Sequence, residues 1–158
     1  MEYFESVDLG NAAIKPLITA MHAFYSPRNL RFGLGKAGQG YASFHVVLNG
    51  ITYGRITFYQ GRLYTIKYYK QDDYAFDVND PGEILFLQIK AFFRKGRLLG
   101  LDEIQNTIQV AEECNKQELA QRQAYREAHP GRRKALKGRN IRHLINRVLF
   151  EGYHYQVA

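Results

Sequence analysis

Basic side chains gather near the C-terminal end of the sequence, in a segment suited to holding phosphate groups. Five of them lie within eight residues and a sixth follows shortly after: Arg132, Arg133, Lys134, Lys137, Arg139 and Arg142. Each lysine or arginine that neutralises a phosphate releases a counterion, so this cluster favours binding to a nucleic-acid backbone. The same charges also suit a solvated surface or an acidic protein partner. We expect phosphate contact to be centred on this segment.

The charge of the whole chain is uneven as well as positive. The net charge is +7, and residues 1–70 hold eight basic against three acidic residues, while residues 130–158 hold seven against one. Two basic regions therefore flank an acidic middle, and clustered positive charge is typical of a nucleic-acid binder. We expect further phosphate contacts in the N-terminal half, at Arg28, Arg31, Lys36 and Lys67.

A glycine-rich segment, RFGLGKAGQG, occupies residues 31–40. It contains the spacing GxGxxG, but a dinucleotide site requires a helix to begin at these glycines, and here a strand is expected to follow. We therefore predict either a mobile hairpin loop that presents Arg28, Arg31 and Lys36 to phosphate or a plain flexible connection, and we expect no cofactor.

A second kind of chemistry depends on residues 77–90. Asp77 precedes the apolar run EILFLQIK, which ends in Gln88-x-Lys90. If that run is a buried strand, it resembles the metal-binding core of restriction-type nucleases, in which an aspartate and a Glu or Gln hold Mg²⁺ and a lysine assists the attacking water. The resemblance implies a Mg²⁺-dependent nuclease with Asp77 and Gln88 as ligands and Lys90 as the assisting cation.

The residues around the same run favour a helix over 81–95 instead. Asp80 is suited to the N-cap, Pro81 to the first turn and Glu83 to the reciprocal position of a capping box. Gly96 then follows as the C-terminal glycine. We favour the helix, and with it a protein that has no catalytic residue and no metal.

The centre of the fold is predicted to be a three-stranded antiparallel meander. Strands near 41–48, 51–59 and 62–70 are separated by Asn49-Gly50 and Gln60-Gly61, which are hairpin turn signals. Strict alternation from these turns places two sets of side chains on opposite faces. One face would hold Phe44, Val46, Leu48, Tyr53, Arg55, Arg62, Tyr64, Ile66 and Tyr68, and the other His45, Thr52, Ile56, Phe58, Thr65, Lys67 and Tyr69. We expect the first face to be mostly core and the second to be exposed.

Helical periodicity surrounds this meander. An N-terminal helix is expected around the stripe Ile14–Tyr25, with Pro16 in its first turn. A long helix over 101–128 is apolar in its first half and polar almost all round over 112–128. A last helix follows Asn140 with the stripe Ile141–Leu149. The predicted fold is α+β: a helix, a three-stranded meander, and three C-terminal helices on one face of the sheet. Residues 1–100 would form the core and 101–158 a helical extension, within one compact domain.

The leading functional prediction is a small basic, non-enzymatic nucleic-acid-binding or regulatory protein, with DNA and RNA equally open. Arg55, Arg62 and Lys67, with Tyr53, Tyr64 and Tyr68, would add charge and stacking if a sheet face is open. The alternative is a protein-binding inhibitor, regulator or assembly factor, such as a virus-encoded one, with residues 112–128 contacting the partner or a second copy. The nuclease is the second alternative.

The predicted cellular setting follows from two absences in the sequence. The chain has one cysteine, Cys114, which excludes an internal disulfide and indicates a reducing compartment. No apolar segment has the length of a membrane span or the pattern of a signal peptide. We therefore expect a soluble, cytoplasmic protein without membrane contact, and a buried Cys114.

Overall fold

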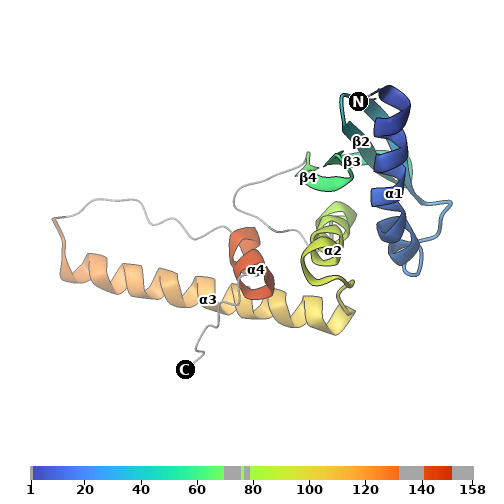
Figure 1. Cartoon of the computed structure of the whole chain (residues 1–158). Helices are drawn as coiled ribbons and strands as arrows, with labels where there is room; N and C mark the ends of the chain where they lie inside the picture. Colours follow the sequence, from blue (N-terminus) through green and yellow to red (C-terminus); the bar gives the residue numbers. More distant parts are fainter. Residues whose placement is uncertain (1, 70–75, 77–78, 132–140, 151–158) are drawn as a thin grey trace. The chain divides into compact units, whose positions relative to one another are not determined.

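The computed structural model describes residues 2–69, 76, 79–131 and 141–150, and shows an α+β protein with an N-terminal helix, an antiparallel sheet and further helices (Figure 1). The chain forms two compact units. Unit 1 spans Met1–Gln71 and Asn79–Leu98, and unit 2 spans Asp72–Val78 and Leu99–Ala158. The elements in chain order are α1 (Tyr3–Met21), β1 (Leu30–Gly38), β2 (Tyr41–Leu48), β3 (Ile51–Tyr59), β4 (Arg62–Tyr68), α2 (Pro81–Lys95), α3 (Leu101–Ala128) and α4 (Ile141–Phe150).

The sheet of unit 1 is an antiparallel meander of four strands in the order β1-β2-β3-β4. Its three turns are Gln39-Gly40, Asn49-Gly50 and Gln60-Gly61, with φ of 53° and 91°, 52° and 80°, and 51° and 77° respectively. Positive φ at both central residues is what a type I′ hairpin turn requires. The two turns expected from the sequence are confirmed, and the first turn joins two regular strands where the sequence indicated a glycine-rich loop.

The additional strand is β1, and the prediction of a glycine-rich loop at residues 31–40 is wrong. β1 pairs with β2 from Leu30 opposite Leu48 to Gly38 opposite Tyr41, with a register shift between Leu34 and Ala37. Glycine weakens an isolated strand, but this segment is held by its pairing with β2, and Leu30 is fully buried. The meander therefore has four strands rather than three.

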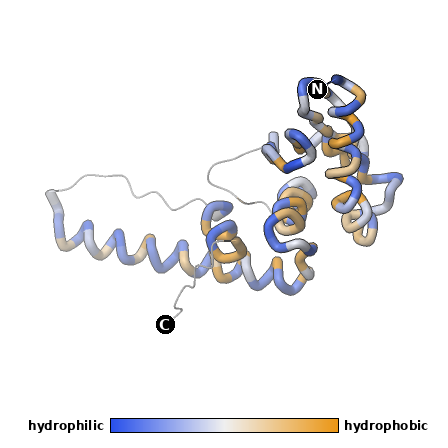
Figure 2. Tube along the Cα trace, in the orientation of Figure 1, coloured by the Kyte–Doolittle hydropathy of each residue, from blue (hydrophilic) through white to orange (hydrophobic). Residues whose placement is uncertain are grey.

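Two helices cover one face of this sheet and form the core with it. α1 packs on β1 and β2. Gly10 permits the helix to approach the sheet closely, because any side chain there would collide with Ala42: a Cβ at Gly10 would lie 2.5 Å from the Cβ of Ala42. From α2, the ring of Phe93 lies 5.9 Å from that of Phe58. The orange stretches of both helices in Figure 2 mark the apolar residues that these contacts use. The buried cluster comprises Ile14, Leu17, Met21, Leu30, Ala42, Phe44, Val46, Leu48, Ile56, Phe58, Tyr68, Leu85, Phe86 and Ile89.

A bulge in β3 exchanges the two faces of that strand relative to strict alternation. Val47 lies opposite Thr52 and Val46 lies opposite Gly54, so Tyr53 is an extra residue. Beyond it, Ile56 and Phe58 point into the core. Tyr53 itself packs against the core as predicted, but the predicted faces of β3 are wrong from Gly54 onward, because an inserted residue reverses every side chain after it.

A second bulge, in β4, returns the residues after Tyr64 to the faces that strict alternation from the turns predicts. Thr57 pairs with Thr65 and Phe58 with Leu63, so Tyr64 is the extra residue. Tyr68 is consequently buried, on the core face where the sequence placed it.

Residues 81–95 form the helix α2, as the capping signals predicted. The Asp80 carboxylate accepts a hydrogen bond of 3.0 Å from the Gly82 N–H, Pro81 is in the first turn, and Gly96 ends the helix with φ of 74°. The strand that the nuclease resemblance requires is therefore wrong for this segment. Gln88 is buried within α2, and Asp77 lies outside the described residues.

α1 begins earlier than its apolar stripe indicates, which places Pro16 in the helix interior rather than in the first turn. The preceding turns are held by contacts with the sheet. Ser6 is buried, and its hydroxyl accepts a hydrogen bond of 2.8 Å from the Gly40 N–H and donates one of 3.0 Å to the Glu2 carbonyl. Tertiary contact therefore extends the helix beyond the stripe.

Unit 2 consists of α3 and α4, which lie side by side (Figure 1). The bounds of α3 are those predicted, and its first half buries Ile104, Ile108, Ala111 and Cys114. From α4, Leu144, Ile145 and Leu149 are buried, in agreement with the predicted stripe. Of the three C-terminal helices, α2 packs on the sheet, whereas α3 and α4 belong to this second unit. Within the described residues, no helix is long and apolar enough to cross a membrane.

Candidate nucleic-acid interface

The face of the sheet opposite α1 and α2 carries a row of basic side chains. The alternation that sends Phe44, Val46 and Ile56 into the core turns their neighbours outward. His45 pairs with Arg55, and Arg55 pairs with Lys67, so these three residues form one row across β2, β3 and β4. All three are exposed. No helix of unit 1, within the part of the chain that the structure describes, packs on this face. We call it the open face.

Two more arginines extend the row toward both edges of the sheet. Arg31 of β1 lies opposite Val47, and Arg62 of β4 lies opposite Tyr59. Both arginines are exposed, and they lie on β1 and β4, the two edge strands of the sheet. The open face therefore presents positive charge on three of its four strands, and His45 adds an imidazole on the fourth.

Aromatic and hydroxyl side chains occupy the positions between these charges. The Nζ atom of Lys67 lies 6.0 Å from the centre of the Tyr69 ring, at the distance of a cation–π contact. The hydroxyls of Ser43 and Thr57 are 3.1 Å apart and link β2 to β3. Tyr59 adds a further ring that is exposed. Rings and hydroxyls of this kind stack on bases and donate to phosphates without selecting a sequence.

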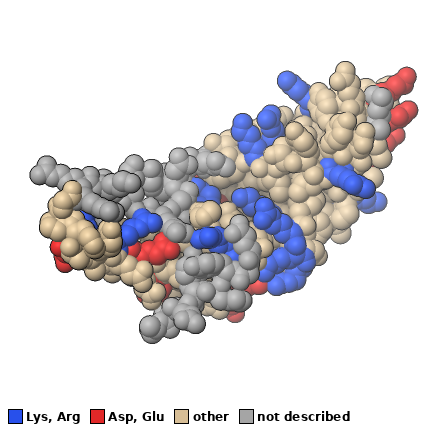
Figure 3. Space-filling model, turned by 60° about the vertical axis from the view of Figure 1, so that its left-hand side comes forward, with Lys and Arg blue, Asp and Glu red and all other residues tan. Residues whose placement is uncertain are grey.

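The strands contain no acidic residue that would neutralise this charge. Between Leu30 and Tyr68 the sequence holds five lysines and arginines and neither aspartate nor glutamate. Figure 3 shows Lys and Arg side chains at several places on the visible face of the molecule. Arg55 and Lys67 lie directly opposite each other, and like charges in such a pair destabilise a sheet. Solvent and salt screen this repulsion because both side chains are exposed, and a bound anion would reduce it further.

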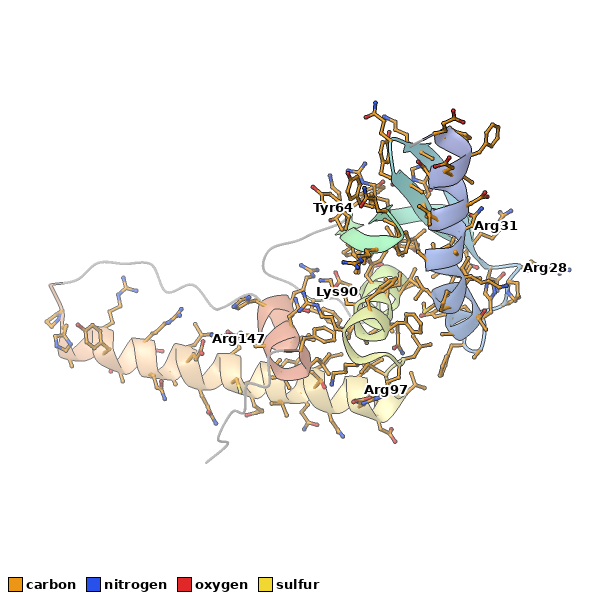
Figure 4. The ribbon with its side chains drawn as sticks, in the orientation of Figure 1. Arg28, Arg31, Tyr64, Lys90, Arg97 and Arg147 are labelled. Carbon is orange, nitrogen blue, oxygen red and sulfur yellow. The ribbon has the colours of Figure 1, made fainter. Side chains whose placement is uncertain are left out.

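The structure brings together only some of the phosphate-binding residues expected from the sequence. Arg31 and Lys67 share the open face, and Lys36 is exposed within β1. Arg28 is exposed in the connection between α1 and β1 (Figure 4). Its backbone N–H donates a hydrogen bond to the Ser26 hydroxyl. Arg142 is half-buried on α4, in unit 2. The remaining expected residues, Arg132, Arg133, Lys134, Lys137 and Arg139, lie outside the described residues.

The structure places Arg55 and Arg62 on the same surface, which the sequence analysis named with Lys67 for the case of an open sheet face, and it adds His45. Strict alternation separated Arg55 from Lys67, and the bulge at Tyr53 is what places them on one face. One signal was already visible in the sequence, namely the absence of any acidic residue over the whole span of the four strands.

The described residues offer little for other chemistry. Within residues 2–69, 76, 79–131 and 141–150, no group of three His, Cys, Asp or Glu side chains is placed to hold a metal ion. Cys114 is buried, and this burial raises the pKa of its thiol, with the charges of Glu118 and Glu113 adding to the effect. A buried thiol that resists ionisation is a poor nucleophile.

Comparison with known proteins does not assign the chain to a family. No protein-family model, curated protein or solved structure matches it. A function can therefore be proposed only from the sequence and from the geometry of the described residues.

Proposed function

We propose that the protein binds nucleic acid without catalysing a reaction, and that it does so by phosphate contacts on the open face of its sheet. The observation that supports this is the basic row of His45, Arg55 and Lys67, with Arg31 and Arg62 beside it and no acidic residue on any strand. A polyanion is the ligand that such a surface attracts most strongly.

The dimensions of the open face suit several phosphates at once. From β1 to β4 there are three strand spacings, or about 14 Å. From Arg62 to Lys67 along β4 the distance is roughly 16 Å at the rise of an extended strand. Four exposed basic side chains lie within this area: Arg31, Arg55, Arg62 and Lys67.

The basic segment 132–139 adds to the proposal as a second phosphate-binding region. It lies outside the described residues, so it stays a prediction from the sequence. Its contribution is separable from that of the open face, because the two belong to different units.

A salt titration tests the role of the open face. For a single strand, the slope of log K against log salt is about 0.7 for each phosphate contact, so four contacts predict a slope of about 3. Arg55→Gln and Lys67→Gln should each reduce the slope by about 0.7. Lys15→Gln is the matched control, since Lys15 is exposed on α1, the helix that covers the other face. Equal slopes for wild type and both open-face variants would remove the proposal.

A second candidate function is protein contact through the far half of α3. From Asn115 to Ala128 no residue of this helix is buried, and Figure 2 shows this half as predominantly hydrophilic. A helix that is polar on all sides either projects into solvent or packs on a partner. We propose that residues 112–128 contact a second copy or another protein. A sedimentation series in protein concentration tests the first form, and a constant monomer mass would exclude it.

A further inference from the structure

The end of the sheet where β3 turns into β4 is hollowed. The hollow has a volume of about 490 Å³ and is lined by Tyr59, Gln60, Arg62, Leu63 and Tyr64. This volume lies within the range of small-molecule sites, roughly 300–1,000 Å³. Two of its lining residues, Tyr59 and Arg62, pair with each other in the sheet and belong to the open face.

Both aromatic side chains that line this hollow are exposed to solvent. Tyr64 is 74% exposed and Tyr59 is 48% exposed. Tyr64 is the bulge residue of β4, so the bulge itself is the reason that this ring leaves the regular alternation of the strand. Two accessible rings and one arginine among the five lining residues combine a stacking surface with a phosphate-binding charge.

We propose that this hollow, which we call the hairpin hollow, receives an unpaired nucleobase, and that the ligand of the open face is therefore single-stranded. The inference rests on the proposed nucleic-acid binding and specifies its substrate class. A base in a duplex is stacked on its neighbours and cannot present its face to a tyrosine, whereas a base in a single strand can. Tyr59 and Tyr64 supply the rings, and Arg62 supplies the charge for the adjoining phosphate.

The position of the hairpin hollow allows one strand to use both features. From Arg62 the strand β4 leads to Lys67, which pairs with Arg55 in the basic row. A nucleic-acid strand with one base in the hairpin hollow would continue over this row, with its phosphates toward the arginines and the lysine. The same route is closed to duplex DNA at its first step, because the base cannot enter.

The test compares a fluorescent oligothymidylate of roughly ten nucleotides, its RNA counterpart and a blunt DNA duplex of the same length. Wild type should bind the single strands more tightly than the duplex. Tyr64→Ala should weaken single-strand binding by about five- to a hundredfold and leave duplex binding nearly unchanged. Tyr64→Phe should retain the wild-type affinity because it keeps the ring.

A control variant and the unfolding midpoint exclude indirect effects. Tyr3→Ala removes a tyrosine of α1 that is 49% exposed, close to the exposure of Tyr59, and should bind as wild type does. Tyr64 is so exposed that its alanine variant should keep the thermal midpoint of wild type, which a melting curve checks.

The outcomes separate this inference from the proposed function. Equal binding of single strand and duplex, with Tyr64→Ala unchanged and Arg55→Gln weakened, would overturn the hairpin hollow and leave the nucleic-acid function in place. Absence of binding to any of the three probes at low salt would overturn both.

Discussion

Replacing Gly54 with alanine tests how closely β3 packs against β4 and against α2 on the core face of the sheet. Gly54 follows the bulge residue of β3, is buried, and pairs with Val46 and with Tyr68. A Cβ at this position would lie 2.5 Å from the Cζ atom of Phe86 and closer still to the backbone carbonyl oxygen of Lys67. The ring can rotate away, but the carbonyl is held by the strand.

The expected cost follows from these two contacts. Overpacking a core by one methyl group costs about 1–3 kcal/mol when neighbouring side chains can adjust. Here one of the two neighbours is backbone, so we expect Gly54→Ala to lower the free energy of unfolding by about 3 kcal/mol or more. That loss corresponds to a fall in the melting temperature of roughly 10 °C or more. Urea unfolding followed by circular dichroism measures it.

Gly33 provides the control within the same sheet. It lies in β1, its φ is outside the left-handed region, and no heavy atom stands within 4 Å of a Cβ built there. Gly33→Ala should therefore change the free energy of unfolding by less than about 1 kcal/mol, and alanine can even stabilise by restricting the unfolded chain. If Gly54→Ala unfolds as Gly33→Ala does, with the same urea dependence, α2 does not pack over this bulge.

Two other predictions concern α2 and α3. Asp80→Ala removes the cap on the Gly82 N–H and the 3.3 Å hydrogen bond from the Tyr68 hydroxyl, and should lower the free energy of unfolding by about 1–2 kcal/mol in urea. Asp80→Asn keeps the capping oxygen and should recover most of that loss, so equal losses for both variants would argue against the cap. Cys114 is 1% exposed with a raised thiol pKa, and should react with a thiol reagent only slowly until denaturant is added. Rapid labelling of the folded protein would contradict the packing of α3.

The elements that the sequence predicted correctly are those encoded by neighbouring residues. The Asn49-Gly50 turn depends on two adjacent residues that both adopt positive φ. The start of α2 depends on Asp80 and Pro81, and its end on Gly96. Signals of this range can be read from one sequence because nothing distant has to be known.

The elements that the sequence did not predict depend on pairing between strands. β1 is held by its register with β2, which outweighs its low strand propensity. The bulge at Tyr53 leaves no local signal, yet it decides on which face Arg55 lies. Since the open face requires Arg55 and Lys67 on the same side, the candidate site emerged only with the register.

The glycines and the bulge of β1 have a consequence for association in concentrated solution. β1 is an edge strand, and an unprotected edge can template pairing with another chain and start aggregation. The register shift between Leu34 and Ala37 breaks the row of backbone groups, and the exposed Lys36 places a charge within the break. Both features are ways in which natural proteins protect an edge, so we expect light scattering to show no growth of large particles as the protein is concentrated. The glycine-rich segment that looks like a ligand-binding loop in the sequence is thus an edge strand that carries two features known to limit edge-to-edge pairing.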